Sequence, residues 1–216
     1  MASKDLNLEA LMAIDDFYTN LIFFLRWIHI LSGIIWIGFL YFFNLVNVPF
    51  QAVLEKECKP KVNPILLSRC LWWFRWAAMS TFLIGLALLL IKYTVGNLWM
   101  DDVTGTMSHR AMWILYGTVL GTIMWFNVWF IIWPAQKQII TWVKAGQAPP
   151  EMAALGKRAL VFSRTNAYLS GPLLFSMIAP SNYGAMSVGT LVIVTVVGLG
   201  VIHGLIKLSY NVGKDI

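Results

Sequence analysis

The strongest constraint on this chain is a series of long apolar runs. Of its 216 residues, 59% are hydrophobic and only 12% are charged, whereas a typical soluble domain carries about 25% charged residues. A run of about 20 apolar residues is long enough to cross the hydrocarbon core of a bilayer as one helix. Lipid offers no hydrogen-bond partner to an open backbone, so each run is expected to be helical. The sequence therefore predicts an all-α integral membrane protein.

Five membrane spans are expected, and they form one transmembrane helical domain over residues 1–216. The fourth span is the weakest, because Arg164, Asn166 and the pair Gly171-Pro172 interrupt it. Pro134, at the end of the third span, predicts a kink or a stop. The expected spans cover about residues 18–48, 71–95, 110–133, 160–178 and 186–208.

Lysine and arginine predict the orientation of these spans. The segment 51–69 and the segment after the third span are rich in bases, whereas Asp15, Asp16 and Asp101 lie in the alternate segments. The positive-inside rule then places the N-terminus outside and the C-terminus inside. We expect the protein in the lipid bilayer of the bacterial inner (cytoplasmic) membrane, with the first span kept as an anchor. Since the net charge of +6 comes from these loops, no nucleic-acid partner is expected.

The first span, from Arg26 to Pro49, carries its polar residues on one side. At about 100° per residue, the polar positions fall within roughly 60° of His29 on a helical projection. The other side is apolar. A stripe of this kind is expected to face protein, a cofactor or a cavity. The stripe consists of Arg26, His29, Gly33, Trp36, Leu40, Asn44 and Asn47.

Two histidines lie inside spans, His29 in the first and His203 in the fifth. A buried neutral imidazole can ligate haem iron or copper, relay protons, or hydrogen-bond a neighbouring helix. We predict both as metal ligands of haem b. At 1.5 Å per residue, His29 lies about a dozen ångström below the outer boundary and His203 about twice as deep. One iron can join them only if the helices tilt, and the alternatives are two haems or another axial ligand. His109, at the outer mouth of the third span, is interpreted as a surface histidine.

Arginines inside or beside the spans are candidates for binding anions. A charge within a span is costly, which makes it a site hypothesis. We predict that Arg26, Arg75 and Arg164 clamp haem propionates, a quinone headgroup or an anionic substrate. For Arg75 and Arg164 the alternative is snorkelling to the inner headgroups. Asn44 and Asn127 are expected as additional donors beside the cofactor.

Several classes of chemistry are excluded. The expected spans contain no Asp or Glu, so carboxylate proton relays and paired-carboxylate hydrolysis are not expected. The sequence has no CxxCH, nucleotide-binding motif or nucleophile elbow. The pairs Gly117-x-x-x-Gly121 and Gly200-x-x-x-Gly204 predict close packing between helices.

Ordered motifs in this sequence resemble the bacterial membrane-bound urate oxidases. In the first span the motifs are Arg26-Trp27-x-His29, Gly33, Trp36-Ile37-Gly38 and Tyr41-Phe42-Phe43-Asn44 with Val48-Pro49. In the third span they are Gly121-Thr122-Ile123-Met124, Asn127-Val128-Trp129 and Ile132-Trp133-Pro134-Ala135-Gln136-Lys137. Further likeness lies in Arg164-Thr165-Asn166 and in Pro172-Leu173 with Met177.

The resemblance implies a membrane domain that takes part in urate oxidation and passes electrons to a c-type cytochrome domain fused at its C-terminus. This chain ends at Ile216 without a CxxCH, so the expected electron partner is a separate c-type cytochrome or a quinone. We therefore expect a redox protein that binds haem b. The alternative is a non-catalytic accessory or assembly subunit of a larger oxidase or oxygenase complex, with other membrane subunits or further copies as partners. Transport is a weaker third alternative, because repeats and buried carboxylates are lacking.

Overall fold

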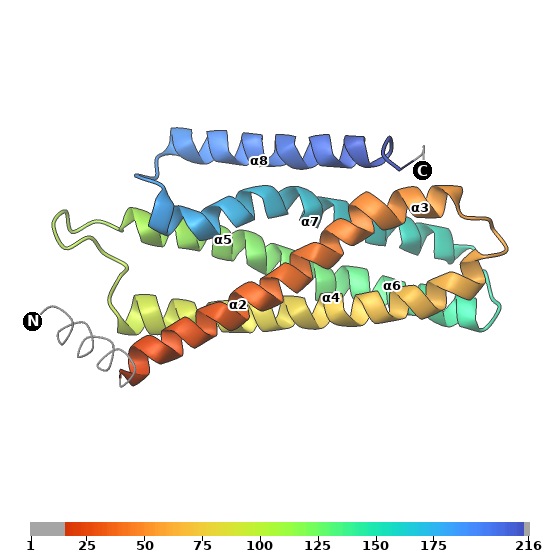
Figure 1. The fold of residues 1–216 in the computed structure, drawn as a ribbon, viewed down its shortest axis with the longest axis horizontal. Helices are drawn as coiled ribbons and strands as arrows, with labels where there is room; N and C mark the ends of the chain where they lie inside the picture. The colour runs from red at the N-terminus through yellow and green to blue at the C-terminus, as the bar shows by residue number, and fades with distance from the viewer. Residues whose placement is uncertain (1–15, 214–216) are drawn as a thin grey trace, which may run out of the picture.

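The computed structural model describes residues 16–213. Within that range, five long helices run back and forth along one bundle (Figure 1). The first consists of α2 (Phe17–Tyr41), η1 (Phe42–Asn47) and α3 (Val48–Val53), and the second of α4 (Lys59–Leu89) and η2 (Leu90–Val95). The third consists of α5 (His109–Phe126), η3 (Asn127–Ile132) and α6 (Trp133–Lys144), and the last two are α7 (Glu151–Asn182) and α8 (Val188–Ser209).

Four of these helices are long and apolar enough to cross a membrane: residues 17–53, 59–95, 109–144 and 188–209. Large apolar side chains stay exposed along them, among them Phe23, Ile34, Leu83, Val119 and Ile193. In water such a surface would drive association, whereas acyl chains solvate it in a bilayer. The prediction of an all-helical, multi-pass membrane protein is confirmed. The remaining helix, α7, is the one whose span the sequence predicts to be the weakest.

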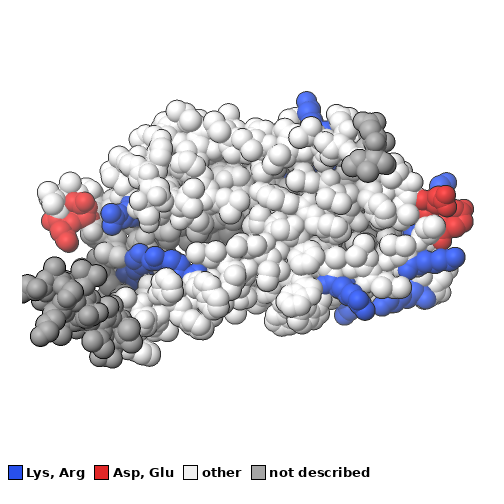
Figure 2. Space-filling model, in the orientation of Figure 1, with Lys and Arg blue, Asp and Glu red and all other residues white. Residues whose placement is uncertain are grey.

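Charged side chains lie toward the two ends of the bundle on the face shown in Figure 2, with an uncharged band between them. We call one end the Asp16 end. It holds the starts of α2, α5 and α8 and the ends of η2 and α7. We call the other the Lys144 end. That the Asp16 end faces outward stays a prediction from the charge distribution of the sequence.

Several helices extend further than expected, mainly at the Lys144 end. The segment 51–69 was expected as a loop, but α3 continues to Val53 and α4 begins at Lys59. The third span does not end at residue 133, because α6 continues it to Lys144. The fourth helix covers Glu151–Asn182, a longer range than 160–178. Hydropathy marks only the part of a helix inside the hydrocarbon, while the backbone hydrogen bonds continue into water.

The proline of the third span does not stop its helix, and a local widening explains why. Proline has no N–H, and its ring crowds the carbonyl four residues earlier. The turns of η1 and η3 are π-helical, and they precede Pro49 and Pro134, respectively. A π-helical turn holds one more residue than an α-helical turn and so relieves this crowding. The same two turns contain Asn44 and Asn127.

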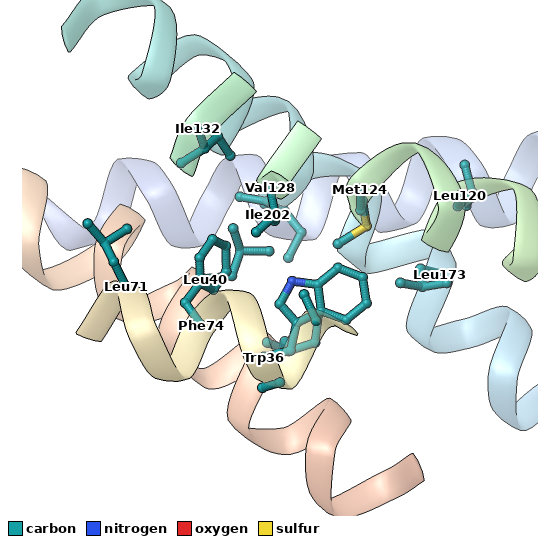
Figure 3. Packing of buried hydrophobic residues seen from close by; sticks show 14 of the residues in the cluster. Trp36, Leu40, Leu71, Phe74, Leu120, Met124, Val128, Ile132, Leu173 and Ile202 are labelled. Carbon is teal, nitrogen blue, oxygen red and sulfur yellow. The ribbon is translucent and has the colours of Figure 1, made fainter. Parts of the chain in front are cut away.

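The core lies where α2, α4, α5, α7 and α8 meet. Helix α2 packs against α4, while α7 lies between α5 and α8 and also contacts η3 and α6. Figure 3 shows the contact of Trp36 and Leu40 with side chains of the other helices. Trp36, Leu40, Phe74, Met124 and Val128 are at most 3% exposed. The buried side of the first helix therefore faces the other helices, as its polar stripe predicts.

Helices α7 and α8 approach each other at two glycines. A Cβ atom built on Gly198 would lie 2.7 Å from the nitrogen of Pro172 and 3.0 Å from the carbonyl carbon of Gly171. Both distances are too short for an ordinary contact with rigid backbone. By contrast, a Cβ on Gly200 or Gly204 would meet no atom within 4 Å. The predicted close-packing role therefore does not apply to the pair Gly200/Gly204 within one copy of the chain.

Side chains cap helix starts at the Asp16 end. Asp16 precedes α2, and its carboxylate accepts hydrogen bonds from the N–H of Tyr18 at 3.0 Å and from the hydroxyl of Thr19. The bond from the Thr19 hydroxyl, followed by backbone amides, holds the pKa of Asp16 below its ordinary value. Ser108 caps α5, and Ser187 and Thr190 form a capping box at the start of α8.

Candidate functional site

The polar stripe of the first helix changes in burial along its length. Arg26 is exposed and His29 is half-buried, whereas Trp36 and Asn44 are buried. Arg26 makes no hydrogen bond or ion pair with any residue in the described range. The stripe is therefore not one continuous site. Its part near the Asp16 end is open, and its part beyond Trp36 belongs to the core.

His29 fits into a space that a glycine leaves in α4. A Cβ on Gly85 would lie 2.9 Å from Cε1 of His29 and 3.3 Å from its Nδ1. The Nδ1 atom is buried and has no hydrogen-bond partner. An unpaired buried nitrogen is costly in an apolar setting. The ring also interacts with the backbone of Thr81, one turn before Gly85, so His29 is packed against α4 with one ring nitrogen unpaired.

His203 lies in a different environment. It is exposed on α8, and its Nδ1 is 2.9 Å from the hydroxyl of Tyr168 on α7. The two rings also stack, with centroids 6.1 Å apart. His29 packs on α4, so the structure does not bring the two predicted haem ligands together. Among the described residues, three or more His, Cys, Asp or Glu side chains nowhere gather into a group that could hold a metal ion.

The two predicted asparagines contact α7, through Nδ2 in each case, while Oδ1 of Asn44 is buried without a hydrogen-bond partner. Asn127 donates through Nδ2 to Oδ1 of Asn166 at 2.8 Å, and Asn166 donates to the carbonyl of Met124 at 2.9 Å. Asn44 donates to the hydroxyl of Ser163 at 2.9 Å and to the carbonyl of Leu40 at 2.9 Å. Asn44, Asn127 and Asn166 are at most 5% exposed. We call these contacts the amide network. These hydrogen bonds hold the first and third helices against α7.

The remaining predicted arginines contact aromatic side chains. The guanidinium of Arg75 lies 3.9 Å from the ring centroid of Trp133 and 5.7 Å from that of Trp129. Arg164 donates to the hydroxyl of Tyr210 at 2.8 Å. Cation–π contacts stabilise a guanidinium without a counter-ion. Aromatic side chains of the same chain thus hold both guanidinium groups in place. Neither group lies beside His29.

Three cations lie close together at the Asp16 end. Arg26 on α2 and Arg110 on α5 are near enough to Lys92 on η2 for their charges to interact. None of the three pairs with a carboxylate in the part of the chain that the structure describes. Like charges at such short distances repel one another, and an anion bound between them would offset that repulsion.

A pocket opens beside these cations, between the start of α5 and the end of α7. Its volume is about 380 Å³. We call it the His109 pocket. Its walls are His109, Arg110, Trp113 and the segment 180–185. Pockets of a few hundred Å³ suit small organic ligands.

One carboxylate that interacts with His109 is already engaged. Asp101 accepts hydrogen bonds from the N–H groups of Val103 and Thr104, both at 3.0 Å. The Thr104 amide, followed by the Val103 amide, lowers the pKa of Asp101. Asp101 lies near His109 but does not line the pocket.

The sequence identified only part of these sites. The sequence places His109 at the outer mouth of a span and predicts a surface residue there, and the structure finds it exposed. Trp113 and the segment 180–185 were not identified. Two sequence features could have predicted the pocket. His109-Arg110 begins one span, and Ser-Asn-Tyr-Gly follows another span that ends at the same end of the bundle. Gly85, Ser163 and Tyr168 were also missed as partners, because contacts between distant helices leave no local pattern.

These features define a multi-pass helical membrane protein with a small polar pocket at one end. The family described as urate oxidase N-terminal matches residues 97–215. That match spans more than half of the chain, and the protein belongs to this family. No curated protein and no solved structure matches it. The matched range contains α5, α7, α8 and the His109 pocket, whereas α2 and α4, with His29 and Gly85, precede it.

Proposed function

We propose that this protein is a membrane redox subunit of the urate oxidase type. It takes electrons from a purine-type substrate and passes them to a separate c-type cytochrome or a quinone. Its membership of the urate oxidase N-terminal family carries the proposal. The four apolar helices support a place in a membrane, and we propose the bacterial inner membrane, with the Asp16 end outside.

The proposal includes haem b, and His29 fits an axial ligand in two respects. Its buried Nδ1 has no partner, and Gly85 leaves room for the ring. Arg26, one helical turn away on the same side, is available to neutralise a propionate. Bound there, haem b would supply a one-electron carrier within the membrane. The packed side chains around Trp36 would exclude water from that part of the bundle.

His203 is proposed as the ligand of a separate site, since it packs on α7. The hydroxyl of Tyr168 fixes the orientation of its ring through Nδ1 and leaves Nε2 free. A hydrogen bond to the other ring nitrogen is the usual support for a metal-ligating histidine. Arg75 and Arg164 are held by Trp133 and Tyr210, so we propose only a positioning role for them unless these contacts open.

A reduced-minus-oxidised absorption spectrum of the purified full-length protein tests the haem. We expect b-type Soret and α bands, and we expect His29→Leu to lose most of them while His109→Gln keeps them. Circular dichroism of the His29→Leu protein checks that its helices are intact. Wild-type protein from haem-replete cells that shows no b-type band would end the haem proposal.

The amide network favours a second candidate function, a non-catalytic accessory subunit. Its asparagines bond to neighbouring helices instead of lining a cavity. In that case the chain would co-purify in mild detergent with a larger oxidase or oxygenase, and the isolated chain would show no redox signal. A stable, haem-containing protein that reduces a c-type cytochrome by itself would contradict this function.

A further inference from the structure

We propose that the His109 pocket binds a small planar organic anion. The pocket brings together a free cation, further hydrogen-bond donors and an aromatic wall, and no carboxylate lines it. The proposal rests on the proposed function only in the choice of urate as the first probe. It names a binding site and its residues, whereas the redox proposal concerns His29 on the first helix.

The charge of the pocket comes from Arg110. This side chain is exposed and has no hydrogen-bond or ion-pair partner among residues 16–213. Lys92 and Arg26 lie close enough to add to the positive potential. Arg110 also lies in the first turn of α5, where the helix dipole favours an anion. A guanidinium can bind two oxygen or nitrogen acceptors of one planar group at once.

His109 supplies a second donor with a defined tautomer. Its Nδ1 lies 3.1 Å from the backbone N of Met186 and accepts a hydrogen bond from that N–H. In the neutral imidazole, Nε2 must then carry the hydrogen. The histidine is therefore a donor at Nε2 in the tautomer that the Met186 contact selects.

Trp113 lines the pocket and carries an unused donor. The residue is 0% exposed, and its indole N–H is buried without a hydrogen-bond partner. Buried polar groups in folded proteins are rarely left unpaired. This N–H lies behind the exposed surface of the pocket, so an acceptor on a bound ligand reaches it when the wall around Trp113 shifts.

Aromatic rings give the pocket its preference for a flat ligand. The Trp113 ring packs on Phe175 at 5.5 Å and on Tyr183 at 6.0 Å between centroids. Tyr183 is 48% exposed and also lines the pocket. An exposed aromatic face stacks on planar heterocycles, whereas a tetrahedral phosphate gains nothing from it.

The end of α7 adds hydrogen-bond acceptors to the pocket. The side-chain amide of Asn182 donates to the carbonyl of Ile178 at 3.0 Å, and the N–H of Tyr183 donates to the carbonyl of Ala179 at 2.8 Å. Neither Ile178 nor Ala179 lines the pocket, whereas residues 180–182, at the end of the helix, do. A planar heterocycle that carries ring N–H groups beside its charged acceptors suits this combination.

Isothermal titration calorimetry with urate tests the site. The full-length protein is placed in nanodiscs of neutral phosphatidylcholine. We expect saturable binding of urate at one site and a loss of about tenfold or more in affinity for Arg110→Gln, since one charge-assisted hydrogen bond is removed. Arg158→Gln, a change at an exposed arginine on α7 outside the pocket, is the matched control and should bind urate as the wild type does.

Two further probes separate the sources of an anion. Caffeine, planar but neutral, and inorganic phosphate, charged but not planar, should each bind at least tenfold more weakly than urate. Phosphate or phosphatidylglycerol nanodiscs that displace urate fully would show a general anion or lipid-headgroup site and overturn the proposal. Absent urate binding, or an unchanged affinity in Arg110→Gln, would overturn it as well. The calorimetry does not depend on haem, so a missing b-type spectrum with intact urate binding would remove only the redox proposal.

Discussion

The amide network in the middle of the bundle and the His109 pocket at its Asp16 end are both polar, but their groups are paired differently. In the network, Asn127 bonds to Asn166, and Asn166 bonds to the carbonyl of Met124. In the pocket, Arg110 has no partner in the described range and the indole N–H of Trp113 is unpaired. Groups that satisfy each other hold helices in place, whereas unpaired donors are available to a molecule from outside.

The comparison predicts opposite responses to substitution. A change in the closed interior should alter stability and leave ligand binding nearly unchanged. A change in the pocket should alter binding and leave stability nearly unchanged. The free energy of unfolding in mixed detergent micelles reports the first response, and the affinity for urate reports the second.

The largest effect is expected where the closed interior is tightest, at the contact of α7 and α8. Gly198→Ala places a Cβ 2.7 Å from the nitrogen of Pro172 and should lower the free energy of unfolding by about 3 kcal/mol, because overpacking forces the helices apart. Gly200→Ala is the matched control, since a Cβ there meets no atom within 4 Å, and should change it by less than about 0.5 kcal/mol. Equal losses in both variants would contradict the observed α7–α8 contact.

Removing the centre of the amide network should have the next largest effect. Asn166→Ala leaves the side-chain amide of Asn127 without its partner and removes the side-chain donor to the carbonyl of Met124, which should cost about 1–2 kcal/mol of unfolding free energy. The double variant Asn127→Ala/Asn166→Ala should cost less than the sum of the single variants, because it removes donor and acceptor together. Strict additivity would show that the two amides do not interact.

The sequence predicted the architecture more fully than the sites. Periodicity placed Trp36, Leu40 and Asn44 on the buried side of the first helix, and hydropathy located five helices. It could not give the partner of Asn127, since the Asn127–Asn166 bond joins positions 39 residues apart on antiparallel helices. Nor could the sequence predict the environment of His29. Its ring lies against Gly85 on another helix, where a residue with a Cβ atom would not leave enough room.

The ends of the helices were predicted less well, for a different reason. A hydropathy window registers where the hydrocarbon ends, and the residues from Trp133 to Lys144 already contain several polar side chains. Their backbone hydrogen bonds nevertheless continue the helix, with η3 accommodating Pro134. At the Asp16 end, α7 continues to Asn182, past the expected end of the fourth span at residue 178, and residues 180–185 there form a wall of the His109 pocket.

A substitution at the buried wall of the pocket should have a smaller effect that separates the two regions. Trp113→Phe removes the unpaired N–H together with one ring of a fully buried side chain, and the space left should lower the unfolding free energy of the ligand-free protein by about 1 kcal/mol. Urate affinity should fall about three- to tenfold, the value of one neutral hydrogen bond. Trp125→Phe removes another buried, unpaired indole N–H, but outside the pocket, and should leave the affinity unchanged. Equal affinity losses in the two variants would show that the Trp113 N–H does not contact the ligand.

The smallest effect tests whether pairing or position distinguishes the two regions. Asp16 lies at the same end as the pocket, yet its carboxylate is already bonded to Tyr18 and Thr19. Because its folded pKa lies below the ordinary value, its cap is present above the unfolded pKa of about 3.9 and is lost as the pH falls through the folded pKa. Asp16→Ala should therefore be slightly less stable than the wild type at pH 7, and the difference should vanish under more acidic conditions. Asp16→Asn, which keeps a capping oxygen, should stay close to the wild type at pH 7. Neither variant should change urate affinity, and a loss of affinity in Asp16→Asn would mean that position at this end, more than free donors, determines binding.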